Sequence, residues 1–266
     1  MKKRKTLGFI GAGRITYILL EGLHKAGQLP AEVCVSDVDE HAVKKLVRRL
    51  PYPQIKSGSN ATVAAKDIVF IGVHPPAISD VLSQIQPSLR SETILVSLAP
   101  KFTIEDLSKL LNGFERIVRL IPNAPSIIGS GFNPIVFANH FSETEKFELI
   151  SLFTAWGKCP EVIEKDLEKY VLLTAVGPTY FWFQWIELCN ILESLGLSSE
   201  DTHQGLKEMI YGANKTLFES GLSADTVMDL VKIKPLKKNE HELRVTYRQA
   251  LTSLFDKLST QSTHHS

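Results

Sequence analysis

The stretch TLGFIGAGRIT, Thr6–Thr16, places a short apolar run directly before Gly11-Ala12-Gly13 and an apolar-periodic segment directly after them. This order predicts a buried strand, a tight glycine turn and a helix. Gly11 permits the turn, and Gly13 lets a pyrophosphate approach the first free N–H groups of the helix. Thr16 stands where a third glycine is usual, which predicts slightly wider packing between helix and strand. The alternative is a glycine turn with a structural role alone.

Short apolar runs and helix-like segments alternate over the first 140 residues or so. The predicted strands are Thr6–Ile10, Glu32–Ser36, Asp67–Val73, Thr93–Leu98, Arg116–Leu120 and Asn133–Ala138. The predicted helices between them are Ile15–Ala26, Glu40–Leu50, Asn60–Ala65, Ile78–Ile85 and Thr103–Leu111. Such alternation is typical of βαβ units, so we expect an α/β fold with a doubly wound, mostly parallel Rossmann sheet covered on both faces.

The pattern changes after Phe141, where Ser142-Glu-Thr-Glu145 has the form of a capping box. Helical periodicity then dominates, over Asp166–Leu195, Ser199–Glu219, Ala224–Val231 and Glu240–Leu258. We therefore predict a dinucleotide-binding domain at 1–160 and an all-helical domain at 161–266, with the boundary near Cys159-Pro160.

Composition excludes several classes of protein. The 30 Lys+Arg nearly balance the 29 Asp+Glu, which is atypical of nucleic-acid binders that rely on bulk charge. Three scattered cysteines favour a reducing compartment over a disulfide framework, and no ligand spacing predicts a metal site. The glycine-broken N-terminus does not resemble a signal peptide, and the uncharged stretch Val171–Ile186 is shorter than the ~18–20 residues that span a bilayer. We expect a cytoplasmic protein with no membrane or nucleic-acid partner.

Asp37 follows the second predicted strand and bears on the choice of cofactor. A carboxylate at this position accepts hydrogen bonds from the adenosine ribose and repels a 2′-phosphate, which favours NAD over NADP. Arg14 complicates this preference, because its guanidinium could reach a phosphate. The alternative role for Asp37 is to cap the following helix.

Five segments in order resemble the pyrroline-5-carboxylate reductase family. GFIGAGRIT resembles its opening, and SGSNATVAAKDIVFIGVHPPAI (Ser57–Ile78) the stretch ending in its Val-Lys-Pro loop. SLAPKFTIEDL (Ser97–Leu107) resembles its Ser-x-x-Ala-Gly segment. RIVRLIPNAPSIIGSG (Arg116–Gly131) resembles its Arg-x-Met-Pro-Asn-x-Pro signature, and LLTAVGPTYFWFQWIEL (Leu172–Leu188) its Gly-Ser-Gly-Pro-Ala-Tyr helix.

The resemblance implies a Rossmann domain, a helical dimerisation domain and NAD(P)H-dependent reduction of a cyclic imine that ends proline synthesis. Three departures stand out. His74 replaces the family's lysine, and Val176-Gly177-Pro178 replaces Gly-Ser-Gly-Pro. The family's Ser-Pro-Gly-Gly-Thr-Thr loop, which holds the substrate carboxylate, is missing, and VKIKPLKKNEHEL (Val231–Leu243) takes its place. We therefore expect weaker or altered activity on pyrroline-5-carboxylate.

The candidate site residues follow from the glycine turn, the strand ends and the resemblance. Asn123 and Thr179 are the candidate catalytic residues, as positioning groups, because a cyclic iminium needs no strong general acid. The candidate contacts of NAD or NADP are Gly11, Ala12, Gly13, Arg14, Ile15, Ser36, Asp37, Asn60, Val73, His74, Pro75, Ala99 and Asn123. His74 could instead be an acid or a turn residue, and Asn123 could serve an Asx-turn.

The apolar segment from about Thr179 to Leu195 predicts a homodimer or larger homo-oligomer, because a small helical domain cannot enclose it alone. We expect the nicotinamide to project from the strand ends toward Gly177–Tyr180. A dinucleotide-binding sensor or partner subunit without reductase activity is the alternative function. A β-hydroxyacid dehydrogenase, with Lys165 or Lys169 as catalytic lysine, is a third. The lysines of Val231–Leu243 fit a solvated loop or an anion site.

Overall fold

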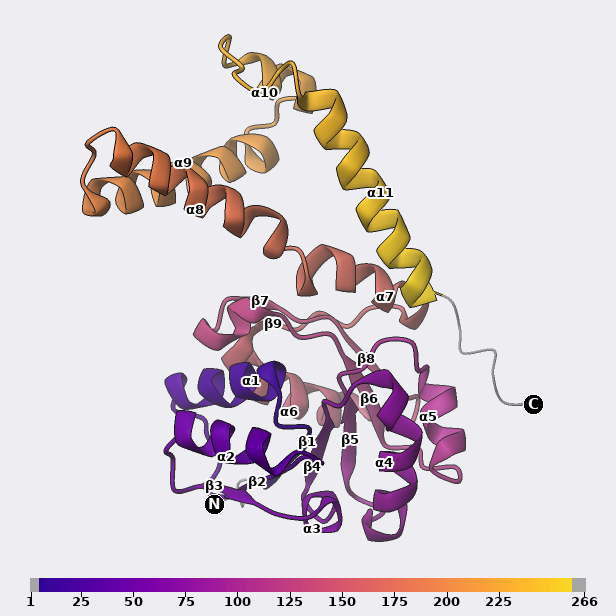
Figure 1. Ribbon diagram of the computed structural model, residues 1–266. Helices are drawn as coiled ribbons and strands as arrows, with labels where there is room; N and C mark the ends of the chain where they lie inside the picture. Colours follow the sequence, from indigo (N-terminus) through magenta and orange to yellow (C-terminus); the bar gives the residue numbers. More distant parts are fainter. Residues whose placement is uncertain (1–4, 260–266) are drawn as a thin grey trace. The chain divides into compact units, whose positions relative to one another are not determined.

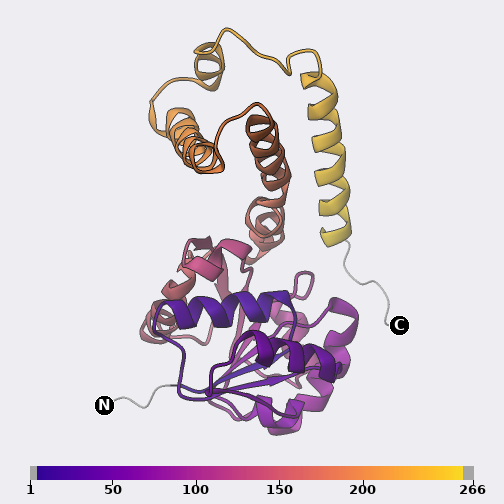
Figure 2. The same ribbon diagram turned by 60° about the vertical axis from the view of Figure 1, so that its left-hand side comes forward.

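The computed structural model describes residues 5–259. The N-terminal part of the chain forms a seven-stranded sheet with helices on both faces (Figures 1 and 2). The strand order is β3-β2-β1-β4-β5-β6-β8. The strands are β1 (Leu7–Ile10), β2 (Val33–Ser36), β3 (Ile55–Ser57), β4 (Ile68–Ile71), β5 (Ile94–Ser97), β6 (Ile117–Leu120) and β8 (Ile135–Phe137). All neighbours are parallel except β6 and β8, which confirms the predicted Rossmann sheet.

Six predicted strands are present with shorter bounds, and three short strands were not predicted. One of these three is β3, at the edge of the main sheet. The other two are β7 (Gly131–Phe132) and β9 (Gly157–Lys158), which pair in a separate two-stranded sheet. Runs of two or three residues beside glycine or proline carry no measurable periodicity.

Alternate residues of each buried strand pack on opposite helical layers. Leu7 and Phe9 of β1 face one hydrophobic cluster, while Ile10 belongs to the other. The first cluster is covered by α1 (Arg14–Lys25), α2 (Glu40–Arg49) and α6 (Glu143–Phe153). The second is covered by α3 (Asn60–Ala64), α4 (Ile78–Ile85) and α5 (Ile104–Leu110). Burial on both faces explains why these strands are continuous apolar runs.

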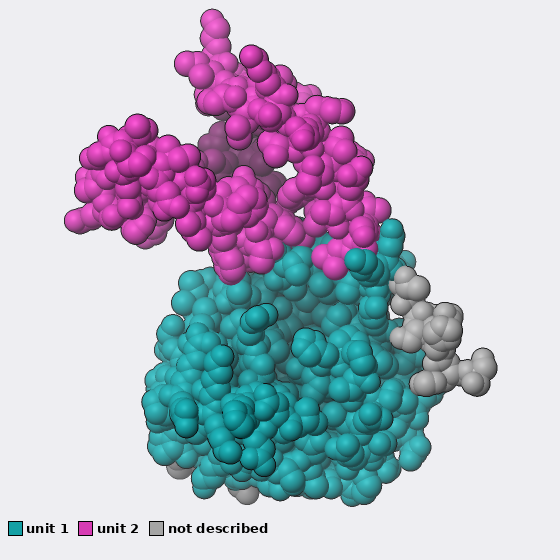
Figure 3. All heavy atoms as spheres, viewed as in Figure 1, with its two compact units in different colours: residues 1–176, 255–266 teal, residues 177–254 magenta. Residues whose placement is uncertain are grey.

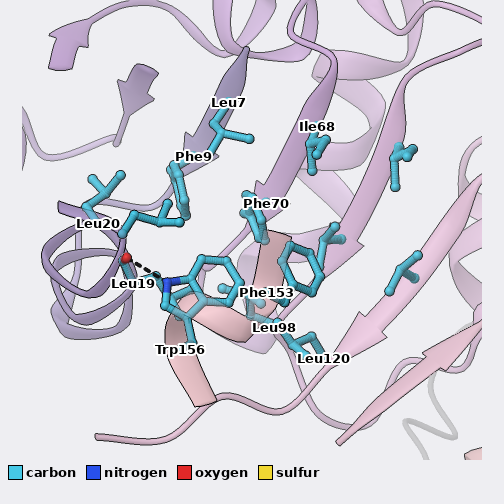
Figure 4. Packing of buried hydrophobic residues seen from close by; sticks show 14 of the residues in the cluster. Leu7, Phe9, Leu19, Leu20, Ile68, Phe70, Leu98, Leu120, Phe153 and Trp156 are labelled. Carbon is cyan, nitrogen blue, oxygen red and sulfur yellow. Dashed lines mark hydrogen bonds between the residues drawn. The ribbon is translucent and has the colours of Figure 1, made fainter. Parts of the chain in front are cut away.

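Trp156 fixes the position of α1 against the sheet. Its ring is fully buried, lies 4.7 Å from Phe153 and 5.8 Å from Phe70 between centroids, and donates Nε1–H to the Leu19 carbonyl at 2.8 Å (Figure 4). A Cβ on Gly22 of α1 would lie 2.9 Å from the same ring. Because helix and ring approach so closely, α1 is held in one place against the sheet.

The segment predicted to be helical over Asp166–Leu195 is helical but divided, and its last helix begins at Thr179 as expected. The structure has α7 (Leu167–Tyr170), a π-helical turn at Val171–Ala175, a break at Gly177-Pro178, and then α8 (Thr179–Ser194). Pro178 has no N–H to donate and its ring disfavours continuation of the preceding helix, so the chain restarts there. The remaining helices are α9 (Ser199–Glu219), α10 (Ala224–Asp229) and α11 (Glu240–Ser259).

The chain forms two compact units, which Figure 3 colours separately. The first unit runs through Val176 and includes the chain again from Phe255, while the second unit is Gly177–Leu254. This division lies later than the boundary predicted after residue 160. Within residues 5–259, no helix combines the length and the apolar character needed to cross a membrane.

Candidate functional site

The glycine turn between β1 and α1 requires glycine at its first position. Gly11 has φ +104°, and a Cβ on it would lie 2.6 Å from the carbonyl oxygen of Gly72. Its N–H donates to the Ser36 carbonyl at 2.8 Å, and the Gly72 N–H donates to the Ile10 carbonyl at 2.8 Å. The turn is therefore wedged between the ends of β2 and β4, and a side chain at Gly11 cannot be accommodated without displacing backbone.

The N-terminus of α1 is open toward solvent and has no cap of its own. Gly13 is the N-cap residue, makes no side-chain hydrogen bond, and no acidic residue follows in the first turn. Side chains do cap α2, α3, α5 and α6, through Asp39, Ser59, Thr103 and Ser142. Beyond the chain neighbours of Gly13, no atom lies within 4 Å of the position a Cβ would take. Free N–H groups and the positive helix end thus face empty space, as anion binding requires.

Thr16 stabilises this turn. Its side chain is fully buried, and its hydroxyl donates to the Gly11 carbonyl at 2.5 Å. The hydroxyl therefore satisfies a carbonyl that glycine could not have reached.

Asp37 joins the end of β2 to the glycine turn. Its Oδ2 accepts the Ala12 N–H at 2.7 Å, and its Oδ1 accepts the Asp39 N–H at 2.9 Å. The N-cap of α2 is Asp39, whose side chain accepts the His41 N–H, so the alternative that Asp37 caps this helix is wrong. Each oxygen of Asp37 keeps a lone pair for a ribose hydroxyl.

Ser36 and Asn60 lie together at the same edge of the sheet. The buried Ser36 hydroxyl donates to Asn60 Oδ1 at 2.7 Å, and Asn60 Nδ2 donates to Gln84 Oε1 at 2.8 Å. This chain of bonds connects β2 with α3 and α4, so Asn60 is fixed beside the end of β2.

A cavity of about 560 Å³ lies next to Asp37, between α2 and the end of β3. It is lined by Asp37, Glu40, Val43, Lys44, Val47, Arg48, Ser57 and Gly58. Glu40 pairs with Lys44 at 3.1 Å, so the two carboxylates and two cations of the lining balance. This balance gives the cavity no preference for a doubly charged phosphate.

The ends of β4 and β5 place further predicted residues at the carboxyl edge of the sheet. Val73, His74 and Pro75 follow β4, where His74 is the exposed N-cap of a 3-10 turn, Pro75–Ala77. Ala99 follows β5 and is 4% exposed. In an open parallel sheet, ligands bind beyond the carboxyl ends of the strands.

Asn123 is largely occupied with holding its own loop. It is 6% exposed, its Nδ2 donates to the Phe132 carbonyl at 3.2 Å, and its Oδ1 accepts the Ser126 hydroxyl at 3.3 Å. Its N–H donates to Asn133 Oδ1 at 3.2 Å. One amide hydrogen of Asn123 is left for a ligand.

Arg119, for which no individual role was predicted, is a buried cation that joins β6 to two carboxylates of the segment after β9. Its side chain is 1% exposed, and its guanidinium donates to Glu164 at 3.0 Å and to Glu168. Glu164 also accepts the Ile104 N–H at 2.8 Å, and Glu168 accepts the Lys101 N–H at 3.2 Å. The available signal was an arginine inside a strand otherwise made of buried apolar residues.

Thr179 and Tyr180 belong to the second unit and begin α8, with Thr179 exposed. The Tyr180 ring packs edge-on against Tyr247 at 5.3 Å between centroids. Burial raises the pKa of both phenols, which keeps them neutral donors near pH 7. Among residues 5–259, no three His, Cys, Asp or Glu side chains form a group that could hold a metal ion.

The structure therefore gathers the predicted residues of the glycine turn with Ser36, Asp37 and Asn60, and aligns Val73–Pro75, Ala99 and Asn123 along the same edge. A glycine turn, an uncapped helix and an acid at the end of β2 define a dinucleotide-binding protein of the Rossmann class.

Known proteins that resemble this chain are oxidoreductases within this class. The family model described as "NADP oxidoreductase coenzyme F420-dependent" matches residues 6–101. The pyrroline-5-carboxylate reductase of Escherichia coli is 25% identical over 229 residues, which cover 85% of this chain and 84% of that protein. The crystal structure of Plasmodium falciparum pyrroline carboxylate reductase with NADP bound has a TM-score of 0.79 at 22% identity, covering 98% of this chain and 99% of that one. The Coxiella burnetii reductase has a TM-score of 0.72 at 22% identity, covering 99% of this chain and 100% of its own.

The chain is thus similar to pyrroline-5-carboxylate reductases over most of its length. The family resemblance and the fold class drawn from the sequence are thereby confirmed.

Proposed function

We propose that the protein is an NAD(P)H-dependent reductase of a small cyclic imine carboxylate of the pyrroline-5-carboxylate type. The observation that carries the proposal is the match to a pyrroline-5-carboxylate reductase over 85% of the chain, which is more than the nucleotide-binding domain alone. A Rossmann domain alone would support only dinucleotide binding.

The residues of the first unit fit the dinucleotide. The space before Gly13, which a Cβ would enter, lies at the free N–H groups of α1 and suits a pyrophosphate. Asp37 is held by the Ala12 N–H in position to accept a ribose hydroxyl. The bound nicotinamide would supply a hydride, while the protein binds, orients and excludes water.

The proposed cofactor is NAD or NADP, with a preference for NAD. A 2′-phosphate beside Asp37 and Asp39 meets two carboxylates, and the cations Lys44 and Arg48 of the adjoining cavity are already balanced by Asp37 and Glu40. Arg14 is the exposed cation at the glycine turn and the proposed partner if NADP is used. The Plasmodium falciparum relative was solved with NADP bound, so both cofactors belong in every assay.

Asn123 and Thr179 are the proposed positioning residues for the reaction. A cyclic iminium is already protonated near neutral pH, so the site needs no strong acid, only groups that hold the ring. The remaining amide hydrogen of Asn123 and the exposed Thr179 hydroxyl suit this role. Because Asn123 also holds its loop, its substitution would alter positioning and local order together.

We propose that the second unit mediates a homodimer and that the protein is cytoplasmic. No residue of α8 is buried, although the helix is rich in apolar side chains. Four of these side chains are each more than 40% exposed: Phe181, Trp182, Phe183 and Ile186. Apolar side chains on all sides of one helix call for a partner surface of obligate, apolar character. Sedimentation should show a dimer or larger species at micromolar concentration, and a stable monomer would refute the assembly.

The second candidate function is dinucleotide binding without reductase activity. It is favoured by the segment Val231–Leu243, which stands where the family's substrate-carboxylate loop should be. Loss of one or two charge-assisted hydrogen bonds to a carboxylate costs about 1.5–3 kcal/mol each, roughly ten- to a hundred-fold per bond. Weak turnover of pyrroline-5-carboxylate therefore agrees with the reductase function. The absence of any turnover agrees with dinucleotide binding alone.

The deciding experiment is a screen of NADH and NADPH oxidation against pyrroline-5-carboxylate, pyrroline-2-carboxylate and 1-pyrroline. Reduction of at least one imine supports the reductase. Tight cofactor binding without reduction of any imine would leave the binding-only function.

A further inference from the structure

Lys101 has a backbone conformation that is rare for lysine. Within residues 5–259, Lys101 (φ 81°) and Asn112 (φ 54°) are the residues other than glycine with positive φ. Asparagine adopts this region readily, whereas a long side chain does so only when its surroundings hold it there. The motif that Ser97–Lys101 resembles ends in glycine at this position, so the chain has kept a glycine-like backbone and added a cation.

The surroundings of Lys101 fix this conformation. Its N–H donates to Glu168 Oε1 at 3.2 Å, and the same oxygen accepts from the buried Arg119. Glu164 completes the arrangement through Arg119 and the Ile104 N–H. A buried guanidinium with two carboxylates therefore holds the loop at Lys101 and Ile104, and the rare conformation is supported by several bonds.

Lys101 lies where a ligand of this fold binds. It follows Ala99 in the loop after β5, at the carboxyl edge of the parallel sheet. Its side chain is half-buried, and its ammonium has no ion-pair partner within 4 Å in the part of the chain that is described. A cation that no carboxylate of the described residues neutralises is available to an anionic ligand at this edge of the sheet.

We propose that the Lys101 ammonium binds the carboxylate of the imine substrate. This inference rests on the proposed function, because the carboxylate that Lys101 would bind belongs to the substrate of that reaction. The chain lacks the loop that holds this carboxylate in the family it resembles, and Lys101 is a compact cation suited to a charge-assisted bond with a carboxylate. The competing role is structural: the ammonium would only offset the surplus negative charge of Glu164 and Glu168 over Arg119.

The test uses Lys101→Gly, which removes the cation while favouring the observed backbone, so the fold should be retained. We expect a ten- to hundred-fold loss of kcat/KM for pyrroline-5-carboxylate, mainly through KM, and no change for 1-pyrroline, which has no carboxylate. Lys101→Arg should restore part of the loss. The matched control is Asn112→Gly, which relaxes the other positive φ without altering charge and should leave both substrates unaffected.

Binding of tetrahydrofuran-2-carboxylate, a ring acid that cannot be reduced, separates this proposal from the proposed reaction. Calorimetry on the NAD- or NADP-loaded protein should show at least ten-fold weaker binding to Lys101→Gly than to the wild type. If no imine is reduced but this difference is found, the reaction is wrong and the Lys101 site stands. Three outcomes would each overturn the role of Lys101. The first is an equal loss of kcat/KM on pyrroline-5-carboxylate and 1-pyrroline. The others are equal affinities of variant and wild type for the ring acid, and no binding of the ring acid to the wild type.

Discussion

Gly13→Val should abolish cofactor binding while sparing the fold. Gly13 has φ −78°, a value open to any residue, and a Cβ there meets no atom beyond the chain neighbours within 4 Å. The valine would instead occupy the space before the N–H groups of α1. Losing two charge-assisted bonds to a pyrophosphate costs about 3–6 kcal/mol, or at least a hundred-fold in Kd. Valine is a poorer N-cap than glycine, so we expect only a small loss of stability, below about 1 kcal/mol.

The assay is calorimetric titration with NADH and NADPH, paired with thermal unfolding. Gly11→Ala is the contrasting variant, because its Cβ would lie 2.6 Å from the Gly72 oxygen at φ +104°. It should unfold several degrees below the wild type, since the left-handed conformation alone costs about 1–2 kcal/mol. Wild-type affinity in Gly13→Val would show that the dinucleotide binds elsewhere and would refute the reasoning.

Three further outcomes follow from individual contacts. Asp37→Ser should shift the ratio of kcat/KM toward NADPH by about ten-fold, because one carboxylate near the 2′-phosphate is removed; an unchanged ratio would contradict its role. Arg119→Met should lower the free energy of unfolding in urea by about 3–5 kcal/mol, because it leaves Glu164 and Glu168 without their cation; a loss below about 1 kcal/mol would contradict this role of Arg119. Bonds from the Ser142 N–H and the Arg116 guanidinium lower the pKa of Glu145 from 4.5 to about 2, so this stabilisation is full above about pH 4.5 and is lost as the pH falls to about 2. Glu145 is partly exposed, so Glu145→Gln should flatten acid unfolding only modestly in that window, and an unchanged pH profile would contradict the contribution.

The sheet could be predicted from the sequence because its strands are buried on both faces. Ile68–Ile71 is an uninterrupted apolar run bounded by polar residues and glycine, and such runs have few alternatives in an α/β chain. Edge and accessory strands could not be predicted, because β7 and β9 are two residues long and depend on each other across the fold. The break before α8 could be predicted, because Gly177-Pro178 interrupts the helical segment.

The site could be predicted where backbone conformation dictates the residue type. Gly11 must be glycine because its φ is positive and a Cβ would meet the Gly72 carbonyl. Gly13 leaves open the space that a pyrophosphate needs. Both glycines are visible in the sequence. A turn role for Asn123 was one of its two predicted roles, but its partners Ser126, Phe132 and Asn133 could not be predicted, because they meet it only after the chain turns back. Lys101 was missed because its rare φ is a property of the folded backbone.

The most direct test of the account is transfer of deuterium from the reduced cofactor to an imine. The protein is incubated with NADH or NADPH that carries deuterium in the transferred position at C4, together with pyrroline-5-carboxylate or pyrroline-2-carboxylate, and the product is analysed by mass spectrometry. The account predicts proline one mass unit heavier, with the deuterium on the former imine carbon. Tight binding of the cofactor with no deuterium in any product would contradict it.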